Sequence, residues 1–188
     1  MLSHNLLGET VSDMLDTQSA WLDETDLQSA RDRLPIVYVD AVPVRVDAQG
    51  QVTEVGLLLR SLPDGSISRA IVSGRVLYGE RVRDALLRHL EKDLGSMALP
   101  SIPTSPQPFT VVEYFPDPSV TGFHDARQHA VSLAFIVPIN GDCAPSQSAL
   151  DLIWVTPTEA VSLAFQSQMS GGQDRLVRMA LAHCGLLA

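Results

Sequence analysis

Three polar residues, His89, Lys92 and Asp93, have the spacing of ligands on one face of a helix, and they are the candidate catalytic residues. Side chains three and four positions apart are neighbours on a helix surface. Carboxylates in this arrangement hold Mg²⁺, which requires hard oxygen ligands. Only Asp93 supplies one, and at about 4 Å an ammonium repels another positive charge by about 4 kcal/mol in an effective dielectric of about 20. These three residues therefore have the spacing of such ligands but only one of the carboxylates.

Lys92 is the only lysine in the chain, which has twelve arginines. One hypothesis is that its ammonium takes the place of a metal ion and binds a substrate phosphate. The alternative is a solvated side chain on the helix surface. His89 and Asp93 also leave two interpretations open, which are a weak transition-metal site with too few ligands and a hydrogen bond within the helix.

An amphipathic helix must carry these residues. Between Gly79 and Gly95 apolar residues recur every four positions and predict one buried face. These apolar residues are Val82, Leu86, Leu90 and Leu94. Gly95 stands where a left-handed C-cap would end the helix.

The rest of the chain predicts strands before and after this helix. Alternation, β-branched residues and turn residues predict strands at 36–46, 52–60, 67–72, 109–115, 129–139 and 150–155. Pro43 indicates an edge strand or a bulge. Thr156, Pro157 and Glu159 match a helix capping box, and a last helix is predicted at about 173–184. This order differs from the alternation of a doubly wound fold and predicts an α/β protein of the α+β-like kind, with a mixed sheet and packed helices.

Residues 1–33 differ in composition from the rest of the chain. They hold seven acids and two arginines, and apolar residues from Val11 to Leu15, with Trp21 and Leu22, predict a short stripe. We interpret them as an acidic, partly helical N-terminal extension, and residues 34–188 as one domain. The extension is expected to pack on this domain or on a partner subunit, as in a homodimer.

Four residues around the predicted helix have the spacing of the Nudix box. Five residues separate Gly74 from Glu80, seven separate Glu80 from Arg88, and Gly95 follows at the expected distance. From about residue 34 onward the chain therefore resembles a divergent Nudix hydrolase. The resemblance implies a Nudix-type mixed sheet sandwiched by helices. It also implies structural roles for these four residues, with Glu80 and Arg88 bracing the loop against the helix.

The chain departs from the box where the family binds metal. The resemblance implies carboxylates at positions 89, 92 and 93 that hold Mg²⁺ or Mn²⁺ and help to activate water. Here these residues are His89, Lys92 and Asp93, so metal binding is expected to be weak or absent. Asp93, the Gly74 carbonyl and Glu113 are the candidate ligands for any metal that is retained.

The resemblance implies a hydrolase that acts on a nucleoside-diphosphate-linked or related phosphoanhydride substrate. The substitutions in the box predict that its metal-dependent activity is weakened or lost. The alternative is a catalytically silent Nudix-fold protein, which binds a phosphorylated ligand or serves as a regulatory or scaffold subunit.

Three further residues are candidates for binding a phosphorylated substrate. Arg75 follows the box glycine, and His124 and Arg127 belong to a polar cluster before a predicted strand. If the pleat of that strand extended back through the cluster, Asp125, Arg127 and His129 would share one side. Arg127 would then bind a phosphate or carboxylate through two hydrogen bonds, and the alternative is that the cluster is an ion-paired start of the strand.

Composition limits the partners. The net charge of -9 argues against non-specific binding to nucleic acid or a membrane surface, which needs a basic footprint. It leaves a phosphorylated small molecule, held by local arginines, as the expected partner. The sequence has neither a signal-peptide pattern nor an apolar run of about 20 residues that could span a membrane. Two cysteines are too few for a secreted disulfide framework, so a cytoplasmic protein is expected.

Overall fold

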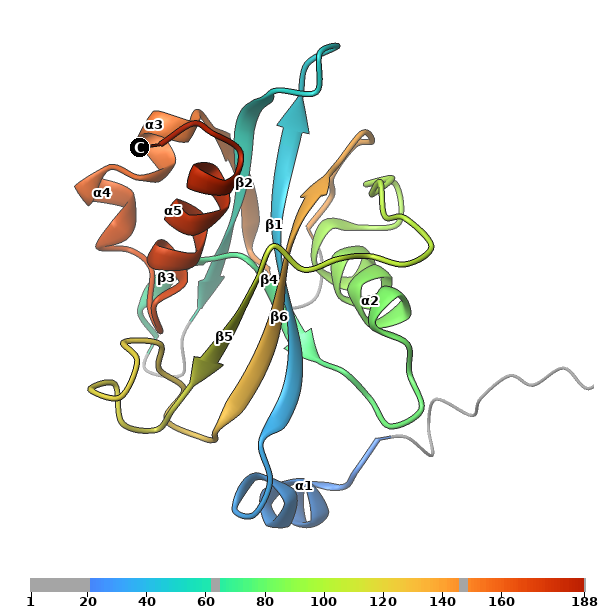
Figure 1. Cartoon of the computed structure of the whole chain (residues 1–188), viewed down its shortest axis with the longest axis vertical. Helices are drawn as coiled ribbons and strands as arrows, with labels where there is room; N and C mark the ends of the chain where they lie inside the picture. The colour runs from blue at the N-terminus through green and yellow to red at the C-terminus, as the bar shows by residue number, and fades with distance from the viewer. Residues whose placement is uncertain (1–20, 62–64, 146–148, 188) are drawn as a thin grey trace, which may run out of the picture.

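A mixed β-sheet with helices on both faces forms the fold, as the sequence predicts (Figure 1). The computed structural model describes residues 21–61, 65–145 and 149–187. The stripe predicted from Val11 to Leu15 therefore lies outside the described residues, in which the sheet has seven strands. In chain order the elements are α1 (Glu24–Arg31), β1 (Ile36–Val46), β2 (Val52–Ser61), β3 (Ile67–Ala70), β4 (Val72–Arg75), α2 (Val82–Leu94), β5 (Thr110–Tyr114), β6 (Ala130–Pro138), β7 (Asp151–Val155), α3 (Pro157–Ala160), α4 (Leu163–Gln166) and α5 (Gln173–His183).

Strand β1 is central, so the expectation that Pro43 marks an edge strand is wrong. On one side β1 runs parallel to β6 along nearly its whole length. On the other side it pairs with β4 as far as Ala41 and with β2 from Val44 onward. Pro43 lies between these two pairings, and the bulge in β1 falls later, between Arg45 and Val46. A proline is tolerated at this position because the partner strand changes there, and no ladder hydrogen bond needs its missing N–H.

The strand predicted at 67–72 is divided into two shorter strands. β1 and β2 pair near their hairpin and then diverge, and β3 and β4 fill the space between them. β3 pairs with β2, whereas β4 pairs with β1. Between them the N–H of Ile71 donates to the side chain of Gln173 rather than to a strand. As a result Gly74 lies inside β4, opposite Val39 of β1.

The two faces of the sheet carry separate apolar clusters. Alternate residues of β1 contribute to each, with Val39 and Ala41 on the α2 side and Val42 and Val44 on the α5 side. Figure 1 shows α2 on one side of the sheet and α3, α4 and α5 on the other. The predicted apolar face of α2 is buried against the first cluster. Among the described residues, no helix combines the length and the apolar character needed to cross a membrane.

The helix α2 ends at Leu94, and its cap differs from the prediction. Gly95 has a φ of 90° but a ψ of 159°, which is outside the left-handed helical region. The N–H of Ala144 donates to the carbonyl of Leu94, so a crossing segment satisfies the end of the helix. A Cβ at position 95 would lie 2.8 Å from the Ala144 carbonyl oxygen, which gives a second reason for glycine.

The start of α3 matches the predicted capping box. The Thr156 hydroxyl accepts a hydrogen bond from the N–H of Glu159, and the Glu159 carboxylate accepts one from the N–H of Thr156. Both bonds satisfy N–H groups that a helix start would otherwise leave without partners.

The close approach of α2 to β4 depends on Gly74. A Cβ at position 74 would fall inside the imidazole ring of His89. His89 is buried, and its ring occupies the space that the absent side chain leaves open. The box glycine therefore has a steric role, since it lets helix and strand pack with a ring between them.

Gly74→Ala should destabilise the fold because the added methyl group would overlap this ring. Overpacking of this kind costs about 1–3 kcal/mol, measured as the free energy of unfolding in urea. In a His89→Ala background the same change should cost less, since the obstructing ring is gone. An equal cost in both backgrounds would contradict the steric role.

Candidate functional site

A cleft of about 640 Å³ opens where β1 and β2 diverge, between α1 and the end of α2. Its lining includes five cationic side chains and, within the described part of the chain, no acidic one. These cations are Arg31, Arg60, Arg75, Lys92 and Arg127. They come from α1, β2, β4, α2 and the turn before β6. The cleft therefore gathers cations in an acidic protein, although Arg31, Arg60 and Arg127 are each paired with an acid outside this lining.

Asp93, the remaining box carboxylate, is fully buried and paired with Arg60. Nη2 of Arg60 lies 2.6 Å from Oδ2 of Asp93, and Nζ of Lys92 lies 4.0 Å from Oδ1. Removing one member of such a buried pair leaves an uncompensated charge, which is strongly unfavourable. Sequence reasoning missed Arg60, because nothing in its local pattern indicates a partner 33 positions away.

His89 is held as a neutral side chain. Its Nε2 lies 3.0 Å from the carbonyl oxygen of Arg75, which can only accept, so Nε2 carries the proton. Burial lowers the pKa of His89, and the nearby charges of Arg88 and Lys92 lower it further. The contact with the Arg75 carbonyl and the charge of Asp93 act in the opposite direction but do not outweigh these effects. Nδ1 is buried without a hydrogen-bond partner among the described residues. The hydrogen bond expected between His89 and Asp93 is not formed, because the ring points to Arg75 and the carboxylate to Arg60.

The residues at these positions do not fit a magnesium or manganese ion. The carboxylate of Asp93 is taken by Arg60, and Lys92 places a positive charge beside it. Among the described residues no group of three or more histidines, cysteines and acids is arranged to hold a metal. Gly74 lines the cleft, but Glu113 does not and instead faces His129 at 3.6 Å. The structure therefore does not bring the three candidate ligands together.

Glu80 and Arg88 brace the loop between β4 and α2. Two hydrogen bonds of 2.7 Å join the guanidinium to the carboxylate, which also accepts from the N–H of Leu77. Partial burial acts to raise the pKa of Glu80, but Arg88 and the Leu77 N–H together hold it below the usual value. Arg88 also donates to the carbonyl of Arg75. The spacing of the box thus corresponds to a structural contact, as expected from the resemblance.

Arg75 has a buried donor that the fold does not use. Its Nη1 is inaccessible to solvent and has no hydrogen-bond partner among the described residues. The guanidinium lines the cleft and lies 5.4 Å from the ring of Trp21, which also lies 5.6 Å from Arg88. An unpartnered buried guanidinium nitrogen is unfavourable unless a ligand completes its hydrogen bonds.

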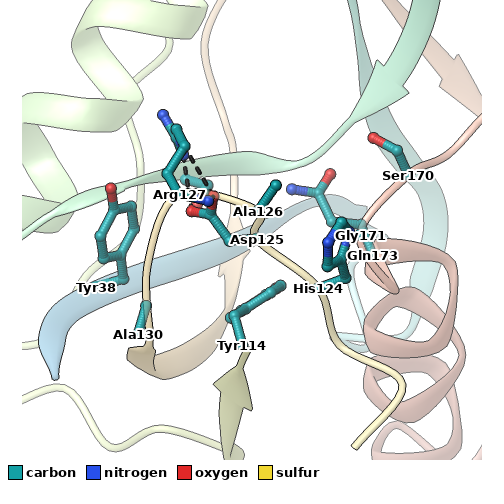
Figure 2. A pocket seen from close by; sticks show the side chains of 11 residues that line it. Tyr38, Tyr114, His124, Asp125, Ala126, Arg127, Ala130, Ser170, Gly171 and Gln173 are labelled. Carbon is teal, nitrogen blue, oxygen red and sulfur yellow. Dashed lines mark hydrogen bonds and ion pairs between the residues drawn. The ribbon is translucent and has the colours of Figure 1, made fainter. Parts of the chain in front are cut away.

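Arg127 and His124 lie at a second pocket of about 270 Å³ that adjoins the cleft (Figure 2). Arg127 lines both cavities, whereas His124 lines only this one. Residues 125–128 form a turn rather than the strand whose pleat was expected to align them. The Asp125 carboxylate nevertheless pairs with Arg127 through bonds of 2.9 and 2.8 Å, because the turn folds one side chain back onto the other.

A buried acid beside the second pocket was also missed by sequence reasoning. Asp40 lies in β1, is 1% exposed and accepts a hydrogen bond from the hydroxyl of Tyr114. Burial raises the pKa of Asp40, although hydroxyl groups of Ser73, Ser132 and Tyr114 oppose this. Tyr114 itself has its pKa raised, first by burial and then by Asp40. The sequence signal that could have identified Asp40 is an aspartate within an otherwise apolar strand.

Comparison with known proteins supports the fold independently of the box. Residues 17–186 match the family described as domain of unknown function (DUF4916). A protein of Jonesia denitrificans, called a possible asymmetric diadenosine tetraphosphate (Ap4A) hydrolase, is 65% identical, with a TM-score of 0.81. The match covers 83% of this chain and 98% of that one. Among curated proteins none matches the chain.

More distant structures share the fold alone. An Ap4A hydrolase of C. elegans is 17% identical with a TM-score of 0.57, over 80% of this chain and 98% of that one. The Nudix domain of Shewanella oneidensis NrtR, solved with ADP-ribose, is 19% identical with a TM-score of 0.56, over 86% and 98%. The chain therefore belongs to the DUF4916 family, and its fold is that of the Nudix proteins.

Proposed function

We propose that this protein binds a compound with phosphoanhydride-linked phosphates in the five-cation cleft, and that fixed side-chain cations take the place of a divalent metal ion. The observation that carries the proposal is the pairing of the last box carboxylate, Asp93, with Arg60 beside a cleft whose described lining includes no acidic side chain. A metal ion needs carboxylate ligands, whereas a phosphate chain needs cations.

The chemistry of the cations suits phosphate oxygens. Arginine presents a planar fork of donors that matches a phosphate, and Lys92 adds a compact charge. Arg75 contributes the buried nitrogen that lacks a partner, and Lys92 is 39% exposed toward solvent. In an acidic protein, a concave basic site concentrates positive potential and attracts an anion locally. The proposal therefore assigns Arg75 and Lys92 as the primary phosphate ligands.

The adjoining pocket supports a nucleoside as the other part of the ligand. Tyr38 and Tyr114 contribute aromatic rings, and Gln173 and Ser170 contribute polar groups. Stacking and a few hydrogen bonds are sufficient to recognise a base or a ribose. Two relatives with this fold are linked to nucleotides. The Jonesia protein is called a possible Ap4A hydrolase, and the Shewanella domain was solved with ADP-ribose. A nucleotide is accordingly the ligand we propose.

Hydrolysis of the same linkage is the second candidate. The 65% identity to a protein called a possible Ap4A hydrolase favours it. The cleft cations could stabilise charge that develops on the departing phosphate. A general base that could activate water is harder to identify. His89 is buried, and its proton-free Nδ1 has no contact with solvent. We therefore propose that any hydrolysis is slow and does not require a metal bound to Asp93.

Arg75→Ala should weaken nucleotide binding. Loss of one charge-assisted contact costs about 1.5–3 kcal/mol, or about ten- to hundredfold in Kd. Isothermal titration calorimetry with ADP would measure it. Arg178→Ala, which removes an exposed arginine of α5, is the matched control and should leave Kd unchanged. Equal affinities of the two variants would contradict the assignment.

Metal removal and Lys92→Ala together test whether a side-chain cation, rather than a divalent metal ion, binds the phosphates. We expect ADP to bind equally well in EDTA and in Mg²⁺, and Lys92→Ala to weaken binding about tenfold in both. Lys92→Arg should retain most of the affinity, since it keeps the charge. If nucleotide binding, or hydrolysis of Ap4A to two nucleotides, needed Mg²⁺, and Lys92→Ala enhanced it, a metal-dependent hydrolase would be the correct description.

A further inference from the structure

Gln128 connects the N-terminal helix to the cleft. It lies in the turn before β6, is only 2% exposed, and uses both polar atoms of its side chain. Its Oε1 accepts from Nε of Arg31 at 3.0 Å, and its Nε2 donates to the Tyr38 hydroxyl and to Asp125, both at 2.8 Å. A buried amide with these three partners has one permitted orientation, so it fixes the position of Arg31 relative to the turn.

The same network fixes Arg127. The Asp125 carboxylate accepts from Gln128 and also holds the Arg127 guanidinium through two bonds. Figure 2 shows the paired side chains of Asp125 and Arg127 at the edge of the second pocket. Arg31 and Arg127 are thus the two ends of one hydrogen-bonded chain, with Gln128 and Asp125 between them.

Each of these arginines keeps a donor for a ligand. Arg31 uses Nε on Gln128 and Nη1 on Glu24, which leaves Nη2 without a partner among the described residues. Arg127 donates from Nε and Nη2 to Asp125, so its Nη1 also has no partner among the described residues. Both side chains line the cleft. Because they are already oriented, binding a phosphate costs less side-chain entropy than it would for free arginines.

The five cleft cations come from five separate segments around one cavity. A single phosphate group cannot contact all of them, whereas a chain of phosphates can. We infer that α1 completes the site: Arg31 and Arg127 bind the part of a phosphate chain that extends beyond the groups held by Arg75 and Lys92. The inference rests on the proposed function and deepens it, since it specifies ligands with a phosphate chain longer than a diphosphate. Gln128 is the positioning residue that sets these two arginines.

Chain-length selectivity tests this inference on the full-length protein. Calorimetric titration would compare ADP, ATP and adenosine 5′-tetraphosphate for wild type and Arg31→Ala. We expect wild type to bind the tetraphosphate more tightly than ADP. Arg31→Ala should lose about tenfold or more for the tetraphosphate and less than about threefold for ADP. Arg33→Ala, an exposed arginine two positions away that does not line the cleft, should match wild type.

Gln128→Leu keeps a similar side-chain volume but removes the hydrogen bonds. It should reduce the preference for the tetraphosphate over ADP and leave the affinity for ADP unchanged. Thermal unfolding without ligand would show whether each variant folds. If either folds poorly, Arg31→Gln provides a second, milder change. Equal affinity of Arg31→Ala and wild type for every ligand, with only a lower Tm, would limit Arg31 to holding α1 and overturn the inference. If wild type bound none of the three nucleotides, the proposed function would fail as well.

Discussion

The buried ion pair between Arg60 and Asp93 removes the last box carboxylate from the groups that the cleft could offer to a metal ion. Asp93 has no exposed surface, so its charge must be compensated inside the protein, and the guanidinium 2.6 Å away provides this. Lys92, 4.0 Å from the other oxygen, adds a second positive charge. A divalent ion would have to displace Arg60 and remain beside Lys92. Because Arg60 pairs with the acid, the described side chains that line the cleft are cationic and neutral, whereas a metal site needs carboxylates.

The scaffold of the box is preserved although its ligands are replaced. Glu80 and Arg88 hold the loop after β4, and Arg88 and His89, neighbours on α2, both donate to the carbonyl of Arg75. Gly74 leaves room for the imidazole ring that makes the second of these contacts. The orientation of Arg75 toward the cleft therefore follows from packing and hydrogen bonds within the protein. A bound metal is not needed to shape the loop.

Local periodicity predicted most of the elements, because burial of one face of a helix or strand appears in the chain's own pattern. The spacing of Val82, Leu86, Leu90 and Leu94 was sufficient to identify α2. The same kind of reasoning treated 67–72 as one strand and Pro43 as the mark of an edge strand or a bulge. Both depend on which strand lies alongside, and a strand's own residues do not encode its partner. The divergence of β1 from β2, which opens the cleft, was for that reason not predictable.

The sequence by itself determined the residue types of the site. It showed that positions 89 and 92 lack carboxylates, that Glu80 and Arg88 have the spacing of a brace, and that one lysine stands among twelve arginines. Only the tertiary structure decided how those charges are paired. Arg60 meets Asp93 across 33 positions, and Arg31 meets Gln128 across 97. Electrostatic and hydrogen-bond energies depend on distance in space, whereas a sequence pattern reports only distance along the chain.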